Sequence, residues 1–320
     1  MSFAEPFFTT INQKLNKAMP IITPLGVICG LIFSKHFSNY TYLVIYLFAF
    51  LTFSSSLSVS PREIKQITKT PSLIFIYFLN TYFINPLFIV IVSRILFAKQ
   101  PEIAIGFILL DSIPLAVTSS IWVTIFKGST ALTLSLIIIS VTLSPIVTPL
   151  IINIFVSSSV EVDTSGLIIS LVQMVLIPSI IGISINHFTK GKTSKVISLY
   201  TSPLSKISLF FIIIINISGV ATDLISNFNI TYIYSILTAI FFILSNFILS
   251  FIVSKRLCKD RASVVSIVLA SSLKNISAGL VLAIHFFPPE SAIPIISSIL
   301  MQNITTSIIG PILFKEKKAN

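Results

Sequence analysis

The sequence predicts an all-α, polytopic membrane protein with ten transmembrane helices, and three observations lead to this fold class. The first is composition: 54% of the 320 residues are hydrophobic, only 10% are charged, and the mean hydropathy is +1.01. Soluble domains carry about 25% charged residues, so this chain lacks the polar surface that would cover a globule in water. The other two observations are a regular series of apolar segments and a one-sided distribution of basic residues.

Apolar segments separated by polar breaks follow one another along the chain, each close to the ~20 residues of helix that cross a bilayer. The segment before the first of them, residues 1–17, mixes aromatic and polar residues, which predicts a helix at the membrane interface. We expect the ten spans at residues 18–35, 41–60, 71–97, 103–127, 131–156, 165–187, 201–222, 230–254, 262–286 and 290–314.

Basic residues favour alternate loops, as they do when helices are oriented against an anionic inner leaflet. With a cytoplasmic N-terminus, the inner segments hold 16 of the 21 Lys and Arg residues and the outer segments hold three. The other two, Lys206 and Lys274, lie within spans, and Lys206 is close enough to the cytoplasmic end for its amine to reach the interface. This asymmetry predicts a multi-pass protein of the cytoplasmic membrane with both termini in the cytoplasm.

Ten spans divide into two sets of five, and because five is odd, the second set would be inverted relative to the first. Short similarities agree with this division, since residues 88–94 at the end of span 3 resemble residues 249–255 at the end of span 8. We expect a first repeat at residues 18–160, a second, inverted repeat at residues 161–314, and a cytoplasmic tail at residues 315–320.

Spans 4 and 9 occupy equivalent places in the two repeats, and both carry a charge followed by small and hydroxyl residues. Span 4 contains Asp111 and Pro114, and span 9 contains Lys274 and Gly279. Matched interruptions in two inverted halves indicate discontinuous helices that meet at a binding site near the midplane. We expect helices 4 and 9 to break and cross, with Asp111 paired to Lys274 because an isolated buried charge is costly.

Unwound backbone exposes N–H and C=O groups, and the N-terminus of the helix that follows attracts anions. The alternative interpretation is that the small residues only allow close helix packing and the polar ones form interhelical hydrogen bonds. The candidate residues for binding substrate or ion are Asp111, Pro114, Thr118, Ser119, Ser120, Ser271, Ser272, Lys274 and Asn275. Weaker candidates for lining a cavity are Thr81 and Asn85 beside Pro86, Asn216 and Ser218, Ser245 and Asn246, and Gln302, Asn303 and Thr305.

Two stretches of the sequence resemble the bile acid:sodium symporter family. One covers residues 114–149 and includes Trp122, and the other begins at Lys274 and Asn275 and continues to Pro288. The resemblance extends over essentially all ten spans. It implies an inverted-repeat carrier with a core domain and a panel domain, crossing discontinuous helices 4 and 9, and transport of organic anions, often with sodium.

The sequence departs from the sodium-coupled members of that family at the positions that resemble their sodium ligands. Thr133 keeps its hydroxyl and is a further candidate ligand, but a carboxylate is lost and an ammonium is gained. The resemblance therefore implies that Lys274 acts as a tethered positive charge beside the substrate in place of sodium. The departures are Thr81 for Gln, Ser120 for Asn, Ile137 for a hydroxyl residue, Ala270 for Glu and Lys274 for Gln.

We therefore expect a secondary transporter of a small organic anion, either bile-acid-like or another carboxylate, that works by alternating access. Sodium coupling of the usual kind is not expected, and coupling to H+ or to Na+ stays open. The alternatives are a channel or a solute-sensing membrane protein, with an arsenite-type efflux carrier less favoured because span 4 has no Cys.

Other classes of function find little support in the sequence. There is no Ser/His, Asp/Asp or His/Glu constellation for an enzyme, and Cys29 and Cys258 form no CxxC motif, so we expect no cofactor and no metal site. The basic residues lie in short blocks between apolar runs, which argues for membrane lipid and against nucleic acid as a partner.

Overall fold

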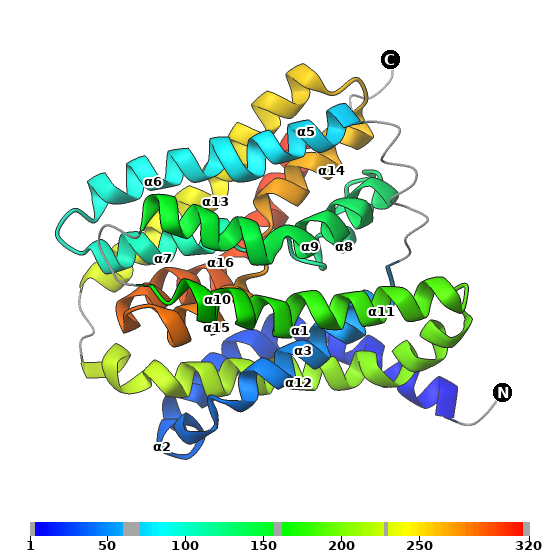
Figure 1. The fold of residues 1–320 in the computed structure, drawn as a ribbon, viewed down its shortest axis with the longest axis horizontal. Helices are drawn as coiled ribbons and strands as arrows, with labels where there is room; N and C mark the ends of the chain where they lie inside the picture. The colour runs from blue at the N-terminus through cyan, green and yellow to red at the C-terminus, as the bar shows by residue number, and fades with distance from the viewer. Residues whose placement is uncertain (1–3, 60–70, 157–161, 227–229, 316–320) are drawn as a thin grey trace.

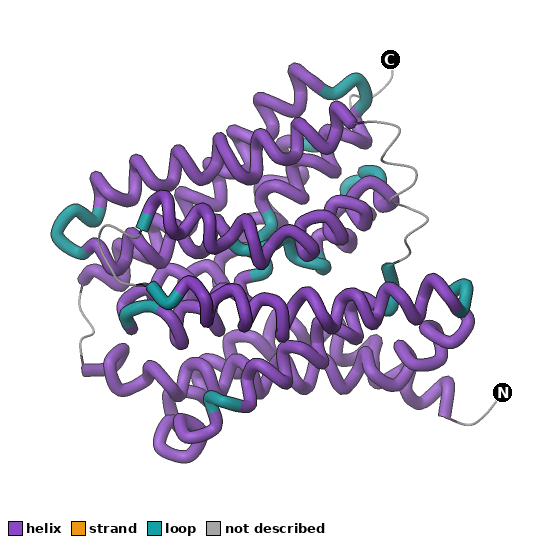
Figure 2. The backbone as a smooth tube through the Cα atoms, in the orientation of Figure 1, coloured by secondary structure: helices purple, strands orange, loops and turns teal. Residues whose placement is uncertain are grey.

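Helices form the regular elements of this computed structural model, which describes residues 4–59, 71–156, 162–226 and 230–315 (Figures 1 and 2). Within those ranges, β-pairing is limited to one isolated antiparallel bridge, between Leu115 and Lys274. The all-α class predicted from the sequence is confirmed.

Each of the ten ranges predicted as a span contains helix, and several are built from two helical pieces. The first half comprises α1 (Ala4–Ile32), α2 (Ser34–Phe37), η1 (Ser38–Tyr40), α3 (Leu43–Ser56), α5 (Pro71–Leu79), η2 (Asn80–Ile84), α6 (Asn85–Leu96), α7 (Pro101–Ser112), α8 (Ser119–Ile125) and α9 (Thr130–Phe155). The second half comprises α10 (Thr164–Leu171), η3 (Val172–Leu176), α11 (Ile177–Phe188), α12 (Lys192–Ser226), α13 (Ile230–Leu257), α14 (Arg261–Ser272), α15 (Ile276–Phe286), η4 (Pro289–Ser291) and α16 (Ala292–Leu313).

By length and composition, six helical stretches of the described residues can cross a membrane. A seventh is added if Ser34–Tyr40 and Leu43–Ser56, which meet at 74°, are counted as one bent span. Two shorter apolar helices, Arg261–Ser272 and Ile276–Phe286, together occupy predicted span 9. The chain is therefore an integral, multi-pass membrane protein, whereas the number of ten spans and the inverted repeat remain predictions.

The helices form two groups, one above the other in Figure 1. We call the lower group the panel; in it α12 packs on α1 and α3, and α11 packs on α3. The upper group, the core, contains α5 to α9, α13, α14 and α16, with α13 packed on α14 and α16, and α6 on α7. Helix α15 lies lower, level with α10, and packs on α16 of the core and on α12 of the panel. Helix α10 continues through η3 into α11 along the boundary and contacts both α9 of the core and α15. This division resembles the core and panel domains that the family resemblance implies.

Each of two long helices contains a π-helical turn just before a proline. In η2 the amide of Asn85 donates to the carbonyl of Asn80, and Pro86 follows; η3 has the same arrangement before Pro178. A proline ring crowds the preceding turn and removes a backbone donor, and a wider turn accommodates both effects. Thr81 and Asn85, two of the weaker candidates, thus lie in and directly after a π turn within a continuous helix.

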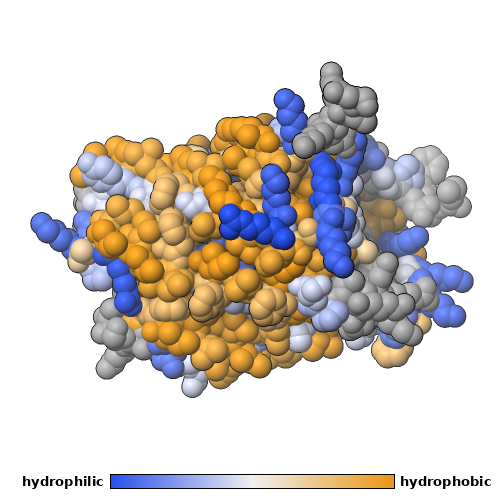
Figure 3. All heavy atoms as spheres, turned by 90° about the horizontal axis from the view of Figure 1, so that it is seen from above, coloured by the Kyte–Doolittle hydropathy of each residue, from blue (hydrophilic) through white to orange (hydrophobic). Residues whose placement is uncertain are grey.

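The face of the molecule seen in Figure 3 is largely apolar, with hydrophilic residues mainly toward its two ends, as a lipid-facing surface requires. Helix α1 begins, and α16 ends, on the right-hand side of Figure 1, where the turn between α11 and α12 also lies. Helix α1 is continuous from Ala4 to Ile32, so no helix boundary occurs at residue 17, and the interfacial position of residues 1–17 stays a prediction. The amine of Lys206 donates a hydrogen bond to the side-chain oxygen of Asn12 in α1.

Candidate functional site

The helix predicted as span 4 breaks between α7 and α8, and the reason is local. Pro114 has no backbone N–H, and a proline disfavours helical conformation in the residue before it. Ile113 is accordingly extended, with φ −71° and ψ 158°. Span 9 breaks between α14 and α15, where Leu273 is also extended, with φ −94° and ψ 107°. Both interruptions predicted from the sequence are present.

The two interrupted segments contact each other through their backbones. The amide of Ala116 donates to the carbonyl of Leu273 over 3.1 Å, and the amide of Asn275 donates to the carbonyl of Pro114 over 2.9 Å. Backbone groups that the broken helices leave without helical partners are thereby satisfied without water, which burial in a membrane protein requires. The expected meeting of segments 4 and 9 is what the structure contains.

Asp111, in the last turn of α7, and Lys274 form a buried ion pair at this junction. The Lys274 ammonium lies 3.4 Å from Asp111 Oδ1 and donates to the Asp111 backbone carbonyl over 2.7 Å. The relative exposures of the two side chains are 3% for Lys274 and 1% for Asp111. Asn246 of α13 donates from Nδ2 to the same Oδ1 over 2.9 Å. Each charge thus offsets much of the burial penalty of the other.

The side chain of Gln302 in α16 binds the backbone of Lys274 through two hydrogen bonds. Its Oε1 accepts from the Lys274 amide over 3.0 Å, and its Nε2 donates to the Lys274 carbonyl over 3.3 Å. A side-chain amide that binds both backbone groups of one residue fixes that residue in an extended conformation. Gln302 therefore supports the break between α14 and α15, and the sequence places it only among the weaker candidates.

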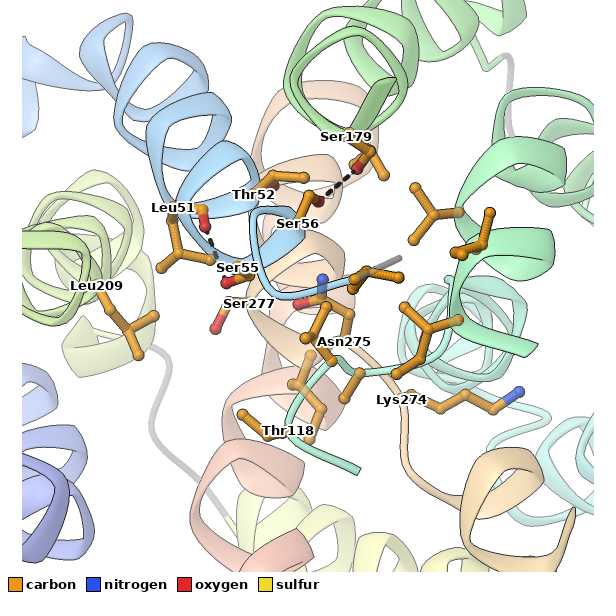
Figure 4. Close-up of a pocket in the computed structure, with 18 of the residues that line it drawn as sticks. Leu51, Thr52, Ser55, Ser56, Thr118, Ser179, Leu209, Lys274, Asn275 and Ser277 are labelled. Carbon is orange, nitrogen blue, oxygen red and sulfur yellow. Dashed lines mark hydrogen bonds between the residues drawn. The ribbon is translucent and has the colours of Figure 1, made fainter. Parts of the chain in front are cut away.

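A cavity of about 180 Å³ lies between panel and core, next to the junction (Figure 4). Helices α3, α11 and α12 line one side, and the two breaks, α9 and α16 line the other. The polar residues that line it are Thr52, Ser55, Ser56, Thr118, Ser179, Lys274, Asn275, Ser277, Gln302 and Asn303. The rest of the lining is aliphatic, with Leu209, Ile213, Ile137, Val141 and Val175 among its members.

The last turns of α3 contribute a group of hydroxyls that the sequence pattern does not single out. Ser55 donates to the Leu51 carbonyl over 2.9 Å, and Ser56 donates to Ser179 of α11 over 3.2 Å. The Thr52 hydroxyl is buried and has no hydrogen-bond partner among the described residues. In the sequence, these cavity-lining hydroxyls are indicated only by the Ser and Thr residues within 52–58, a pattern that is equally typical of close helix packing.

Asn275 is the N-cap of α15, and this fixes how its side chain lies. Its Oδ1 accepts from the Ala278 amide over 3.4 Å, so the Nδ2 donor is left for another partner. Figure 4 places this side chain among the lining residues, near Ser277 and the end of α3. The positive end of the α15 helix dipole and the Asn275 Nδ2 donor therefore both face the cavity.

The Lys274 side chain points away from the α3 hydroxyls (Figure 4). Its backbone lines the cavity, while its ammonium contacts Asp111, next to a second, much smaller void of about 20 Å³. That void is also lined by Ser272, Ser298 and Gln302. The predicted ion pair is present, but the ammonium is turned toward Asp111, because the carboxylate and carbonyl that attract it lie on that side.

The predicted site residues fall into three groups. Thr118, Lys274, Asn275 and Asn303 line the cavity. Asp111, Pro114, Ser119, Ser120, Ser271 and Ser272 lie at the ends of the two breaks behind it, outside its lining. Thr81, Asn85, Thr133 and Asn216 are buried in other helices, also outside that lining.

Several of these buried groups have hydrogen-bond partners within the protein. Asn85 Nδ2 donates to Ser250 over 3.2 Å, and the Thr133 hydroxyl donates to the Ser129 carbonyl over 3.2 Å. By contrast, the Ser119 hydroxyl and both amide atoms of Asn216 have no partner in the described part of the chain. Whether any of these residues binds a ligand stays a prediction.

Several known proteins are similar in sequence to this chain. A model of the Sodium Bile acid symporter family matches residues 44–227. The uncharacterized protein YbaS of Bacillus subtilis (strain 168) is 30% identical over 295 residues, which cover 92% of this chain and 96% of YbaS. The uncharacterized sodium-dependent transporter YocS of the same organism is 29% identical, over 87% of this chain and 84% of YocS. The probable sodium/metabolite cotransporter BASS1 of Arabidopsis thaliana, a chloroplastic protein, is 27% identical, over 94% of this chain and 74% of BASS1.

Proposed function

Because this chain belongs to the Sodium Bile acid symporter family, we propose that it is a secondary carrier of a small organic anion in the cytoplasmic membrane. Family and relatives identify a membrane solute transporter. The proposal that the solute is a small organic anion rests on the cavity between panel and core, where the N-terminus of α15 and several hydroxyl and amide groups meet.

An anion suits this cavity for two reasons. Asn275 Nδ2 and the hydroxyls of Thr118 and Ser277 supply donors, and the N-terminus of α15 supplies the positive end of a helix dipole. No Asp or Glu is among the described residues found to line it. A carboxylate at Asn275 could extend its apolar part along the aliphatic wall that includes Leu209 and Ile213.

The size of the cavity favours a compact substrate. Pockets for drug-sized ligands have volumes of about 300–1,000 Å³, whereas this cavity has about 180 Å³. In this conformation the space suits a short carboxylate better than a steroid. A bile-acid-like solute would require panel and core to separate further.

For topology, we propose ten spans in two inverted repeats, residues 18–160 and 161–314, preceded by an interfacial segment at residues 1–17 and followed by a cytoplasmic tail at residues 315–320. Helix in all ten ranges and one interrupted helix in each repeat support this arrangement. With cytoplasmic termini, the cavity lies toward the inner side, since it is lined by the last turns of α3 and by Ser179 and Ile183 of α11. The structure would then represent an inward-facing state of an alternating-access cycle.

Exchange transport tests the proposal against its alternatives. The full chain is reconstituted in liposomes preloaded with unlabelled pyruvate, lactate, 2-hydroxyisovalerate, benzoate or taurocholate, and entry of the same labelled compound is measured. A carrier gives saturable entry that internal substrate accelerates. Entry without acceleration would indicate a channel, and binding without entry would indicate a sensor. Arsenite as a further solute tests the efflux-carrier alternative.

A further inference from the structure

The charges around the cavity bear on what is carried together with the anion. Lys274 is the only ionisable residue among the described residues found to line the cavity, and its ammonium is paired with Asp111. Asp111 is also the only carboxylate among the buried side chains of the described residues. The pair as a whole is neutral, so it neither attracts a second cation strongly nor supplies a free carboxylate to bind one.

The surroundings of the Lys274 ammonium resemble a cation site that is already filled. The ammonium contacts a backbone carbonyl and a carboxylate oxygen of Asp111, which are the types of oxygen that bind hard cations. The void beside it has a volume of only about 20 Å³. A sodium ion in this place would compete with a covalently attached cation for the same oxygens, and it would be repelled at short range.

We propose that this carrier moves its organic anion without a co-transported cation, so that each turnover transfers net negative charge and the inside-negative membrane potential drives export. The inference rests on the proposed function, and Lys274 acts in it as a positioning residue. It gives the two breaks the charge compensation that a bound cation would otherwise supply, and it stays in place throughout the cycle.

The membrane potential is then the driving force. For a univalent anion that moves alone, a potential of 100 mV changes the equilibrium concentration ratio by about fiftyfold. With the cell interior negative, the higher concentration is outside. A carrier of this kind therefore exports an anionic metabolite that accumulates in the cytoplasm.

The test begins with the exchange assay, which moves no net charge. If none of the five compounds exchanges, the proposed function fails and this inference fails with it. The compound that exchanges fastest then serves as probe for net uptake, with valinomycin and potassium gradients setting the potential.

We expect inside-positive liposomes to accumulate the probe and inside-negative liposomes to exclude it. Replacing sodium with choline should leave uptake of the probe unchanged. Uptake that requires sodium, that follows a pH gradient regardless of potential, or that an inside-negative potential accelerates would overturn the inference while leaving the carrier function intact.

Variants test the part played by Lys274. Lys274→Gln leaves Asp111 as a buried carboxylate without a cation, so we expect transport in choline to fall at least tenfold and sodium to restore part of it. Lys206→Gln, which removes the other lysine within a span, serves as the control and should keep the sodium-independent, potential-driven uptake. If Lys274→Gln kept that uptake unchanged, Lys274 would not be the internal cation.

Asp111→Asn combined with Lys274→Gln removes both charges. This double variant should restore sodium-independent exchange above the level of Lys274→Gln alone, which separates a charge effect from misfolding.

Discussion

The backbone amide of Asn275 donates to the carbonyl of Pro114 over 2.9 Å, and this hydrogen bond joins the break after α7 to the start of α15. Because the backbone of Asn275 forms this link and its Oδ1 caps α15, only the Nδ2 group of the side chain is left for a substrate. The two functions of Asn275, structural and ligand-binding, can therefore be separated by substitution.

Asn275→Asp keeps the N-cap acceptor but replaces the amide donor with a negative charge. Asp is as good an N-cap as Asn, so we expect thermal stability in detergent to change little, whereas exchange of an organic anion should fall at least tenfold through repulsion. Asn275→Ala removes both groups and should lower stability by about 1 kcal/mol. Normal anion exchange by Asn275→Asp would show that the carboxylate binds elsewhere.

Close contact between helices gives a second prediction, at Gly106. A Cβ added to Gly106 in α7 would lie 2.2 Å from the Ser291 carbonyl oxygen, and this backbone atom cannot turn aside. We expect Gly106→Ala to destabilise the protein by about 1–3 kcal/mol, as overpacking does, and thermal unfolding in detergent measures the change. Gly219→Ala is the matched control, since its Cβ would approach a Thr41 methyl at 3.1 Å, which can move. Equal stability of the two variants would contradict this packing.

Charge and polarity in an apolar context explain what the sequence predicts well. Asp111 and Lys274 stand out because a charge at membrane depth is costly, and Pro114 marks the break beside them. Their pairing follows from electrostatics once the two breaks meet, and the structure contains it. Helix positions follow from the apolar segments in the same way.

Other features depend on how helices pack, which one sequence does not reveal. Thr52, Ser55 and Ser56 line the cavity, yet in the sequence they look like small residues that pack against a neighbouring helix in an uninterrupted span. The side toward which the Lys274 ammonium turns is decided by its surroundings, to which Asp111 and Asn246 contribute from two other helices. In the structure the ammonium is directed at Asp111, and the expectation that it lies beside the substrate stays a prediction.

Orientation in the membrane gives a third prediction. Lys99, between α6 and α7, and Lys190, between α11 and α12, are both exposed and lie in loops assigned to opposite sides. In whole cells, an impermeant maleimide should label Lys99→Cys at once and Lys190→Cys only after permeabilisation. Labelling of both from the same side would contradict the proposed topology.

The native cysteines set the background of that experiment. Burial and the nearby Asp260 raise the pKa of the Cys258 thiol to about 11, well above the usual ~8.5 of a free cysteine. Because the thiolate is the reactive form, Cys258 should react slowly near neutral pH and faster as the pH rises toward the raised pKa. Maleimide labelling of a Cys29→Ser protein as a function of pH measures this, and Cys258→Ala supplies the control. Rapid labelling of Cys258 at neutral pH would contradict the raised pKa.

The buried pair gives the last prediction, which concerns stability and needs no substrate. Removing one partner of a buried ion pair leaves an uncompensated charge, and such changes cost about 3–5 kcal/mol. Replacing both partners with well-packed hydrophobic residues of similar volume is often nearly neutral, because no charge is then left to compensate. We therefore expect Lys274→Gln and Asp111→Asn each to lower the midpoint of thermal unfolding in detergent. The double variant should unfold close to the parent, because neither substituted side chain then carries a charge that needs a buried partner.

Asn246 supplies a further check on the same pair, since its Nδ2 donates to Asp111 Oδ1 over 2.9 Å. Hydrogen bonds to a charged group are stronger than those to a neutral one, so Asn246→Leu should destabilise the parent more than it destabilises the double variant, and a double-mutant cycle measures the difference. Additive effects of Lys274→Gln and Asp111→Asn would mean that the two charges do not interact. The pair would then have no part in holding the two breaks together.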